Sequence, residues 1–305
     1  MKILPATQFT PEELTDAYNE TRMDYLVPMP MNVARFQEYT RVYDISLRNS
    51  CVVYDAEAEL ILGLGMLGVR GERSWITRLG VLPYGRRLGT GSAIMSSLLA
   101  QSEELGTKTV WLEVIKGNTP AHQLFYKFGF QDLRELIVAR RPPNPDNNQA
   151  ALERVKRVTA LNHEDAIILL SHRKERPNWL NETETFQNVR NLSALLVELH
   201  NGGRGWITYH AGLLQLTRIV VEVTVGDRCE VAESVLSAMH QRHKRQDAIA
   251  ENFCDDGIWQ GFQKVGYFES FRRVEMKRDL DRVTYDASHT RTDENWWANG
   301  CSVEL

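Results

Sequence analysis

Short apolar runs with a period of two residues follow one another along the chain from Ser50 onward. They are SCVVYDAEAEL (50–60), ILGLGMLGVRGE (61–72) and SWITRLGVLP (74–83), and turn residues separate them. Alternating apolar and polar positions place one face of each strand toward a core. The pattern therefore predicts an antiparallel meander.

Helical patterns lie on both sides of this meander. The segment Thr10–Glu13 combines an N-cap residue, a proline and acidic residues, which is typical of a helix start. Residues 25–31, YLVPMPM, contain prolines and cannot be helical throughout, so they join this helix to a second one around 33–43. After the meander, an apolar stripe over 92–105 predicts a further helix.

The remaining patterns of the first half complete a sheet. Residues 1–7 and TVWLEVI (109–115) are typical of strands, 119–129 of a short helix, and 130–141 of a last strand. This order of elements predicts an α/β protein with a mixed sheet rather than a doubly wound parallel one.

The second half of the chain repeats the end of the first. A hairpin with an Asn-Gly-Gly turn is predicted first, and a strand, a helix and another strand follow it. The stretch 259–280 then parallels the end of the first half, with Glu251 repeating Glu113 and Gly266 repeating Gly129. A duplication of this length indicates two related domains rather than a solenoid.

The duplication and the linker composition around residue 145 predict the domain organisation. We expect a first domain at 1–142, a linker at 143–149, a second domain at 150–281 and a C-terminal tail at 282–305.

Composition and charge narrow the class of protein. The 305 residues are 43% hydrophobic with a formal net charge of -4, so nothing attracts the whole chain to nucleic acid or to an anionic membrane. No apolar stretch approaches the ~18 residues that span a bilayer, and we expect a cytoplasmic protein. Cysteines and histidines are scattered without metal-ligand spacing, which predicts no metal site.

The stretch GRRLGTG, residues 85–91, lies between a predicted strand and a predicted helix. A helix N-terminus has unpaired N–H groups and a partial positive charge, so a glycine-rich turn there can bind a phosphate. Arg86 and Arg87 add guanidinium groups, and Thr90 and Ser92 add hydroxyl donors. The alternative is a tight turn with solvated arginines. The stretch is neither a Walker loop nor a dinucleotide fingerprint.

Two stretches of the first half resemble motifs of the GNAT superfamily of N-acetyltransferases. VLPYGRRLGTG (81–91) is similar to its acyl-CoA pyrophosphate loop, and LEVIKGNTPAHQLFYKFGF (112–130) to its later motif. The resemblance covers residues 1–140. It implies two tandem GNAT-like domains, each a mostly antiparallel, splayed sheet flanked by helices, with acetyl-CoA as co-substrate and no metal.

The resemblance also implies which residues hold acetyl-CoA. The backbone of Leu79, Gly80 and Val81 would bind the pantetheine arm like an added strand. Asn118 matches an asparagine near the thioester, and a role as N-cap of the next helix is equally open. The pyrophosphate would be bound by the loop and the first helical turn, which are Arg86, Arg87, Leu88, Gly89, Thr90, Gly91 and Ser92.

Glu113 matches the glutamate that acts as general base in some relatives. A carboxylate inside an apolar strand is not expected for packing alone, although an ion pair with Arg78 would also explain it. Phe125, expected beside acetyl-CoA, stands where the family commonly has its general-acid tyrosine. Because phenylalanine cannot donate a proton, water or the product ammonium would protonate the leaving thiolate.

Three further residues are candidates for the acceptor pocket. Tyr25 and Met29 fall where GNAT proteins shape this pocket, and they could equally be core residues. Asp44 is a candidate to attract a cationic amine, and a capping role is equally open.

The phosphate loop is missing from the second half. There the chain reads VGDRCEVAES (225–234), and Asp227, Glu230 and Glu233 place negative charge at the helix start, where it would repel a pyrophosphate. The resemblance therefore implies an active N-terminal domain beside a degenerate C-terminal one.

The sequence thus predicts an enzyme, an N-acetyltransferase that moves an acetyl group from acetyl-CoA to a primary amine of a small molecule or peptide by direct attack in a ternary complex. Two alternatives stay open: a non-catalytic acyl-CoA-binding or sensor module, and an acyltransferase for a longer acyl-CoA. A homodimer is also open, and neither nucleic acid nor a membrane is expected as a partner.

Overall fold

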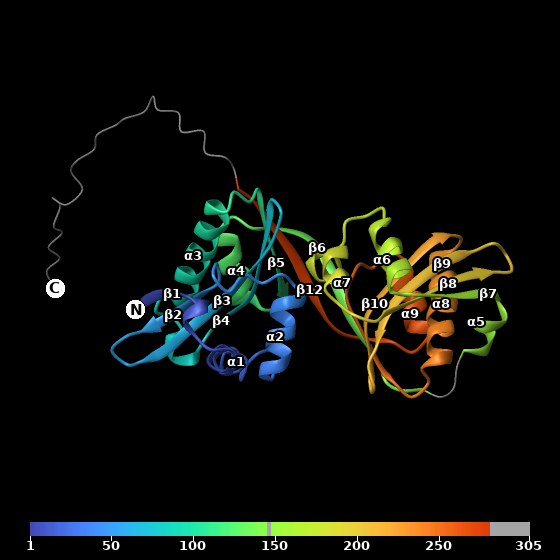
Figure 1. Ribbon diagram of the computed structural model, residues 1–305, viewed down its shortest axis with the longest axis horizontal. Helices are drawn as coiled ribbons and strands as arrows, with labels where there is room; N and C mark the ends of the chain where they lie inside the picture. Colours follow the sequence, from blue (N-terminus) through green and yellow to red (C-terminus); the bar gives the residue numbers. More distant parts are fainter. Residues whose placement is uncertain (145–147, 281–305) are drawn as a thin grey trace, which may run out of the picture.

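A single sheet of twelve strands runs through both halves of the computed structural model, which describes residues 1–144 and 148–280. The strand order is β1-β2-β3-β4-β5-β12-β6-β11-β10-β9-β8-β7. Figure 1 shows two lobes, with β6 and β12 crossing between them. The predicted tail at 282–305 and residues 145–147 of the predicted linker lie outside the described residues.

The first half contains the strands and α-helices that the sequence predicts, in the predicted order, and two short 3-10 helices, η1 and η2, that it does not predict. They are β1 (Lys2–Pro5), η1 (Ala6–Gln8), α1 (Pro11–Glu20), α2 (Val33–Val42), β2 (Cys51–Asp55), β3 (Leu60–Arg70), β4 (Arg73–Val81), η2 (Pro83–Gly85), α3 (Thr90–Glu104), β5 (Thr109–Ile115), α4 (Thr119–Lys127) and β6 (Gln131–Arg141). The meander β2-β3-β4 is antiparallel, as expected.

The second half repeats this order of strands and main helices from its first strand, β7, onward. Its elements are α5 (Gln149–Glu153), β7 (Val155–Leu161), α6 (His163–Ser171), η3 (Trp179–Asn181), α7 (Thr183–Gln187), β8 (Leu192–Leu199), β9 (Arg204–Ala211), β10 (Gln215–Val225), α8 (Arg228–Arg242), β11 (Asp247–Phe253), α9 (Ile258–Lys264) and β12 (Phe268–Asp279). The parallel pair β4-β5 has its counterpart in the parallel pair β10-β11. The α/β class with a mixed sheet is therefore confirmed.

The start of α1 shows how local sequence sets an element. The hydroxyl of Thr10 accepts the N–H of Glu13 at 3.2 Å, and the Glu13 carboxylate accepts the N–H of Thr10 at 2.7 Å. This capping box, with Pro11 at the first helical position, satisfies donors that a helix start otherwise leaves unpaired. The predicted helix start is therefore confirmed.

The two halves exchange their last strands. Strand β12, from the end of the second half, pairs antiparallel with β5 of the first, while β6 pairs antiparallel with β11. The packing follows the pairing, because Val274 and Met276 of β12 lie in the core of the first half and Ile137 and Ala139 of β6 in that of the second. The sheet continues without a break across the expected boundaries of the two domains, 1–142 and 150–281. These domain boundaries stay a prediction.

Equivalent contacts dock the two exchanged strands. Arg278 of β12 donates to the carbonyl of Phe128 at the end of α4, at 3.0 Å. Arg141 of β6 donates to the carbonyl of Val265 at the end of α9, at 2.7 Å. The same residue type thus holds the same helix end in both halves, which supports the duplication.

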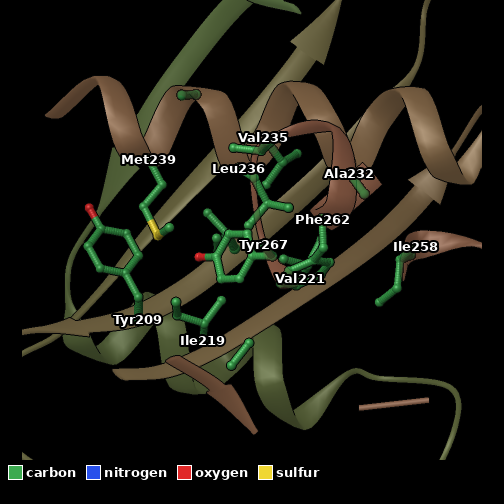
Figure 2. Packing of buried hydrophobic residues seen from close by; sticks show 14 of the residues in the cluster. Tyr209, Ile219, Val221, Ala232, Val235, Leu236, Met239, Ile258, Phe262 and Tyr267 are labelled. Carbon is green, nitrogen blue, oxygen red and sulfur yellow. The ribbon is translucent and has the colours of Figure 1, made fainter. Parts of the chain in front are cut away.

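Helices cover both faces of the sheet in the first half. Helices α1 and α2 pack on one face, over a core that includes Met66 and Trp75. Helices α3 and α4 pack on the other, over a core that includes Ile76 and Leu112. In the second half, Figure 2 shows Val235 of α8 lying toward the sheet in the equivalent apolar layer.

Met276 offers a test of the strand exchange. The side chain is fully buried among residues of the first half, so we expect Met276→Ala to lower the free energy of unfolding by about 2–5 kcal/mol. Urea denaturation measures this. Leu213→Ala is the control, because Leu213 is 93% exposed, and a change within about 0.5 kcal/mol is expected. Equal small effects of both substitutions would contradict the packing of β12 against the first half.

Candidate active site

The site lies where β4 and β5 separate. Their parallel pairing ends at Ile76 and Leu112, and β5 continues beside β12 alone. Strand β4 has a register shift in the same place, with Arg78 in the left-handed region at φ 52°. The bulge and the separation open a cavity of about 690 Å³ between the strands, called the splay cavity here.

Most residues that the sequence predicts for the site line this cavity. Leu88, Met29 and Asp44 do not. Those that do are Tyr25, Leu79, Gly80, Val81, Arg86, Arg87, Gly89, Thr90, Gly91, Ser92, Glu113, Asn118 and Phe125.

The N-terminus of α3 opens at the cavity. Gly89 is its N-cap with φ 81°, a conformation that favours glycine, and no side chain caps the first turn. The hydroxyl of Thr90 donates to the carbonyl of Gly85 at 2.8 Å and so holds the loop. Uncapped N–H groups at a helix start are suited to binding an anion.

The two loop arginines differ in their partners. Arg86 forms an ion pair with Asp24, which follows α1, and its Nε donates to the carbonyl of Val81 at 3.2 Å. The hydrogen bond from Arg86 lowers the pKa of Asp24. Arg87 has φ 62° and no ion pair within the described residues, whereas Leu88 beside it is 62% exposed. Arg87 is therefore the guanidinium that is free for a phosphate.

Glu113 lies on β5 at the point of separation. One carboxylate oxygen accepts the indole N–H of Trp75 at 2.7 Å, and the other, Oε1, is buried and has no hydrogen-bond partner among the described residues. The alternative ion pair with Arg78 is not formed, since Arg78 donates to the hydroxyl of Tyr18 at 2.7 Å. Glu113 thus presents a free acceptor at the splay cavity.

The electrostatics of Glu113 depend on the exchanged strand. Burial raises its pKa to about 7, and the carboxylate of Glu275, directly opposite on β12, adds to this shift. Arg273 opposes the shift. Glu275 itself is buried and pairs with Arg134 at 2.6 Å. A carboxylate with such a pKa can accept a proton near neutral pH.

Asn118 connects α4 to the segment after α1. Its Oδ1 accepts the N–H of Ala121 at 3.4 Å, which is the N-cap contact considered as an alternative, and its Nδ2 donates to the hydroxyl of Tyr25 at 3.1 Å. Because the Tyr25 oxygen accepts this bond, its own proton is available to another acceptor. Phe125 is nearly buried beside them.

Two acceptor candidates lie elsewhere. Asp44 accepts from Arg70 at 2.7 Å and from Asn188 at 2.8 Å, in a separate cavity between the halves. Both of its oxygens are engaged, so the structure does not bring it to the amine site. The carbonyl of Met29 accepts from the hydroxyl of Tyr18 at 3.0 Å, and the side chain of Met29 contacts Arg273.

Two arginines that the sequence analysis did not assign to the site line the splay cavity. Arg22 follows α1 and Arg78 lies in the β4 bulge, and the Nε of each is buried without a partner among the described residues. The only sequence signal was an arginine inside the apolar stretch SWITRLGVLP.

The second half has no equivalent anion site at the start of α8. The side chain of Asp227 caps this helix by accepting the N–H of Glu230 at 2.8 Å, and Glu233 pairs with Arg154 at 2.6 Å. A carboxylate therefore already occupies the place of a phosphate. Among the described residues no cluster of potential metal ligands is found, and no described helix is long and apolar enough to span a membrane.

Comparisons with known proteins show what the chain resembles. Residues 12–130 match the acetyltransferase (GNAT) family. An N-alpha-acetyltransferase of Sulfurisphaera tokodaii is 35% identical over 66 residues, which are 21% of this chain and 40% of that protein. The chain thus matches less than half of that relative's length.

Solved structures resemble the whole chain. A GCN5-related N-acetyltransferase from Sphaerobacter thermophilus has a TM-score of 0.63 at 14% identity, covering 90% of this chain and 93% of that one. A tandem GNAT protein from the clavulanic acid biosynthesis pathway has a TM-score of 0.61 at 13% identity, covering 91% and 98%. Residues 12–130 thus match the GNAT acetyltransferase family, and the whole chain has the fold of tandem GNAT proteins.

The raised pKa of Glu113 has a consequence for stability. An unfolded glutamate titrates near about 4.3 and the folded one at about 7, so the folded state disfavours the ionised form. Stability is therefore lost as the pH rises between these values. We expect Glu113→Gln to be more stable than the wild type by up to about 4 kcal/mol at about pH 8, and the difference to shrink toward about pH 5.

Urea denaturation at both pH values tests this. Glu103→Gln, on the exposed side of α3, is the matched control and should leave stability unchanged at either pH. A pH-independent effect of Glu113→Gln would show that the folded carboxylate titrates normally.

Proposed function

We propose that the protein is an N-acetyltransferase that transfers an acetyl group from acetyl-CoA to a primary amine. The observation that carries this proposal is the free Oε1 of Glu113 in a cavity that also receives the uncapped start of α3. The family match of residues 12–130 supports it. The name of the relative, N-alpha-acetyltransferase, favours an α-amino group as acceptor.

The residues that would hold acetyl-CoA fit its chemistry. The N–H groups of the first turn of α3 and the guanidinium of Arg87 would bind the pyrophosphate. Backbone groups of Leu79, Gly80 and Val81 would bind the pantetheine arm where β5 leaves β4. Because Arg22 and Arg86 now donate to the carbonyls of Leu79 and Val81, we expect these side chains to change partners on binding.

Glu113 would act as the general base. An alkyl ammonium with a pKa near 10.4 is only about 0.1% neutral at about pH 7.4, so the amine must lose a proton before it can attack. The amine nitrogen bonds to the thioester carbonyl carbon and the carbon–sulfur bond breaks. Of the two protons that the ammonium loses, Glu113 takes one, and the other replaces the proton that is donated to the leaving thiolate. Because its pKa is about 7, about half of the Glu113 carboxylate is ionised at neutral pH and can accept a proton.

Tyr25 would return a proton to the leaving thiolate. Phe125 cannot do this, whereas the Tyr25 hydroxyl lies in the same cavity with its proton uncommitted to Asn118. The sequence analysis assigned this step to water or to the product ammonium, and considered Tyr25 only for the acceptor pocket.

Release of free thiol from acetyl-CoA, measured against a panel of primary amines, tests the proposal. We expect turnover with at least one amine, a fall of about 10²-fold or more in kcat for Glu113→Gln, and a loss of rate below about pH 7 in the wild type. Tight binding of acetyl-CoA without turnover on any amine would favour the acyl-CoA-binding module instead. Faster transfer from a longer acyl-CoA than from acetyl-CoA would favour an acyltransferase for longer acyl groups.

Gly89→Glu tests the anion site at α3. A carboxylate at the helix start should weaken acetyl-CoA binding by about tenfold or more, measured by calorimetry. Gly106→Glu is the matched control, since Gly106 has φ 70° at the other end of α3 and, like Gly89, open space around it. Equal weakening by both substitutions would assign the effect to backbone strain.

Tyr25→Phe tests the proton donor. We expect kcat to fall about tenfold to a hundredfold while the affinity for acetyl-CoA is retained. Tyr126→Phe is the control, because Tyr126 is the neighbour of Phe125 but its hydroxyl points away to Asp132, at 2.7 Å. A larger fall in kcat for Tyr126→Phe than for Tyr25→Phe would indicate that Tyr126 is the proton donor.

A further inference from the structure

We propose that the acceptor amine carries a carboxylate, and that Arg78 and Arg22 bind it in the splay cavity. This proposal rests on the proposed function and names its substrate class: small amines with a carboxylate, such as amino acids.

Arg78 has no anionic partner among the described residues. Its guanidinium lies over the rings of Tyr39 at 4.2 Å and Tyr18 at 5.1 Å, and its Nη1 donates to the Tyr18 hydroxyl. Its Nε is buried without a partner, and no carboxylate of the described residues forms an ion pair with it. A guanidinium stays charged, and Arg78 is only partly exposed, so its charge is poorly solvated and lacks an anionic partner among the described residues. A ligand carboxylate would supply that partner.

The duplication provides an internal comparison. Arg218 lies in the corresponding bulge of β10, with φ 55° against 52° for Arg78. Arg218 pairs with the carboxylate of Glu38 at 3.2 Å. The same structural position therefore takes a carboxylate from the protein in the second half, whereas in the first half the guanidinium faces the cavity.

Arg22 adds a second guanidinium to the same wall. It lies over the ring of Tyr25 at 4.1 Å, donates to the carbonyl of Leu79 at 3.2 Å, and keeps a buried Nε without a partner. The guanidinium groups of Arg22 and Arg78 both line the splay cavity, and the planar guanidinium matches the geometry of a carboxylate.

The position of Arg78 separates its guanidinium from the site for the acetyl-CoA pyrophosphate. Tyr18 and Tyr39, which enclose Arg78, belong to α1 and α2, and these helices cover the face of the sheet opposite α3. The pyrophosphate site would be at the start of α3. Arg78 therefore lies on the acceptor side.

A chain of contacts connects Glu113 to Arg78. Glu113 is bonded to Trp75, the ring of Trp75 packs 6.3 Å from that of Tyr39, and Tyr39 carries the guanidinium of Arg78. An amine at Glu113 and a carboxylate at Arg78 would each meet the opposite charge. The site thus selects a molecule that carries both groups.

Steady-state thiol release tests the substrate class. The panel contains α-, β- and γ-amino acids, their carboxamides, the decarboxylated amines and the aminophosphonates. We expect the best carboxylate to exceed its carboxamide in kcat/KM by about 30-fold or more, and Arg78→Met to remove most of this preference by raising KM with little change in kcat. Arg78→Lys should restore part of it.

Arg218→Met is the matched control, because it removes the same side chain from the same kind of bulge, and it should leave the preference intact. Equal use of carboxylates and carboxamides by an active wild type would overturn this proposal and leave the proposed function standing. A preference for phosphonates or for neutral amines would overturn it too. Binding of acetyl-CoA by Arg78→Met, equal to that of the wild type, establishes that the variant is folded.

Discussion

Strand β5 needs a hydrogen-bonded neighbour on the side away from β4, and the chain supplies that neighbour from its other end. An unpaired strand edge exposes a row of backbone N–H and carbonyl groups, which is costly inside a molecule. The first half covers this edge with β12, and the second half covers the edge of β11 with β6. The two cores, the continuous sheet and the relative placement of the lobes all follow from this exchange.

The exchange also shapes the candidate site. Strand β5 can leave β4 without losing its backbone partners, because β12 pairs with it over its whole length. The gap between β4 and β5 becomes the splay cavity. The strand that stabilises this gap brings Glu275 opposite Glu113, so the second half acts on the electrostatics of Glu113 although a carboxylate caps its own helix α8.

The sequence predicted what is local and missed what depends on pairing. The capping box at Thr10, the loop at 85–91 and Glu113 could be found because cap residues, glycines and a charge in an apolar strand are visible in a single stretch. The exchange could not be found, since β6 and β12 have similar patterns and either could close either sheet. Asp44 was misplaced for the same reason: its partners, Arg70 and Asn188, come from distant parts of the chain. The elements between 150 and 191 carried no clear pattern.

The place of β12 near the end of the described chain has a consequence for biosynthesis. A ribosome makes the first half, with the loop at 85–91 and Glu113, long before it makes β12. The native pairing of β5 with β12 therefore forms late in translation, and it is a contact of high sequence separation, which slows folding. The proposed activity should therefore arise only after β12 has been made.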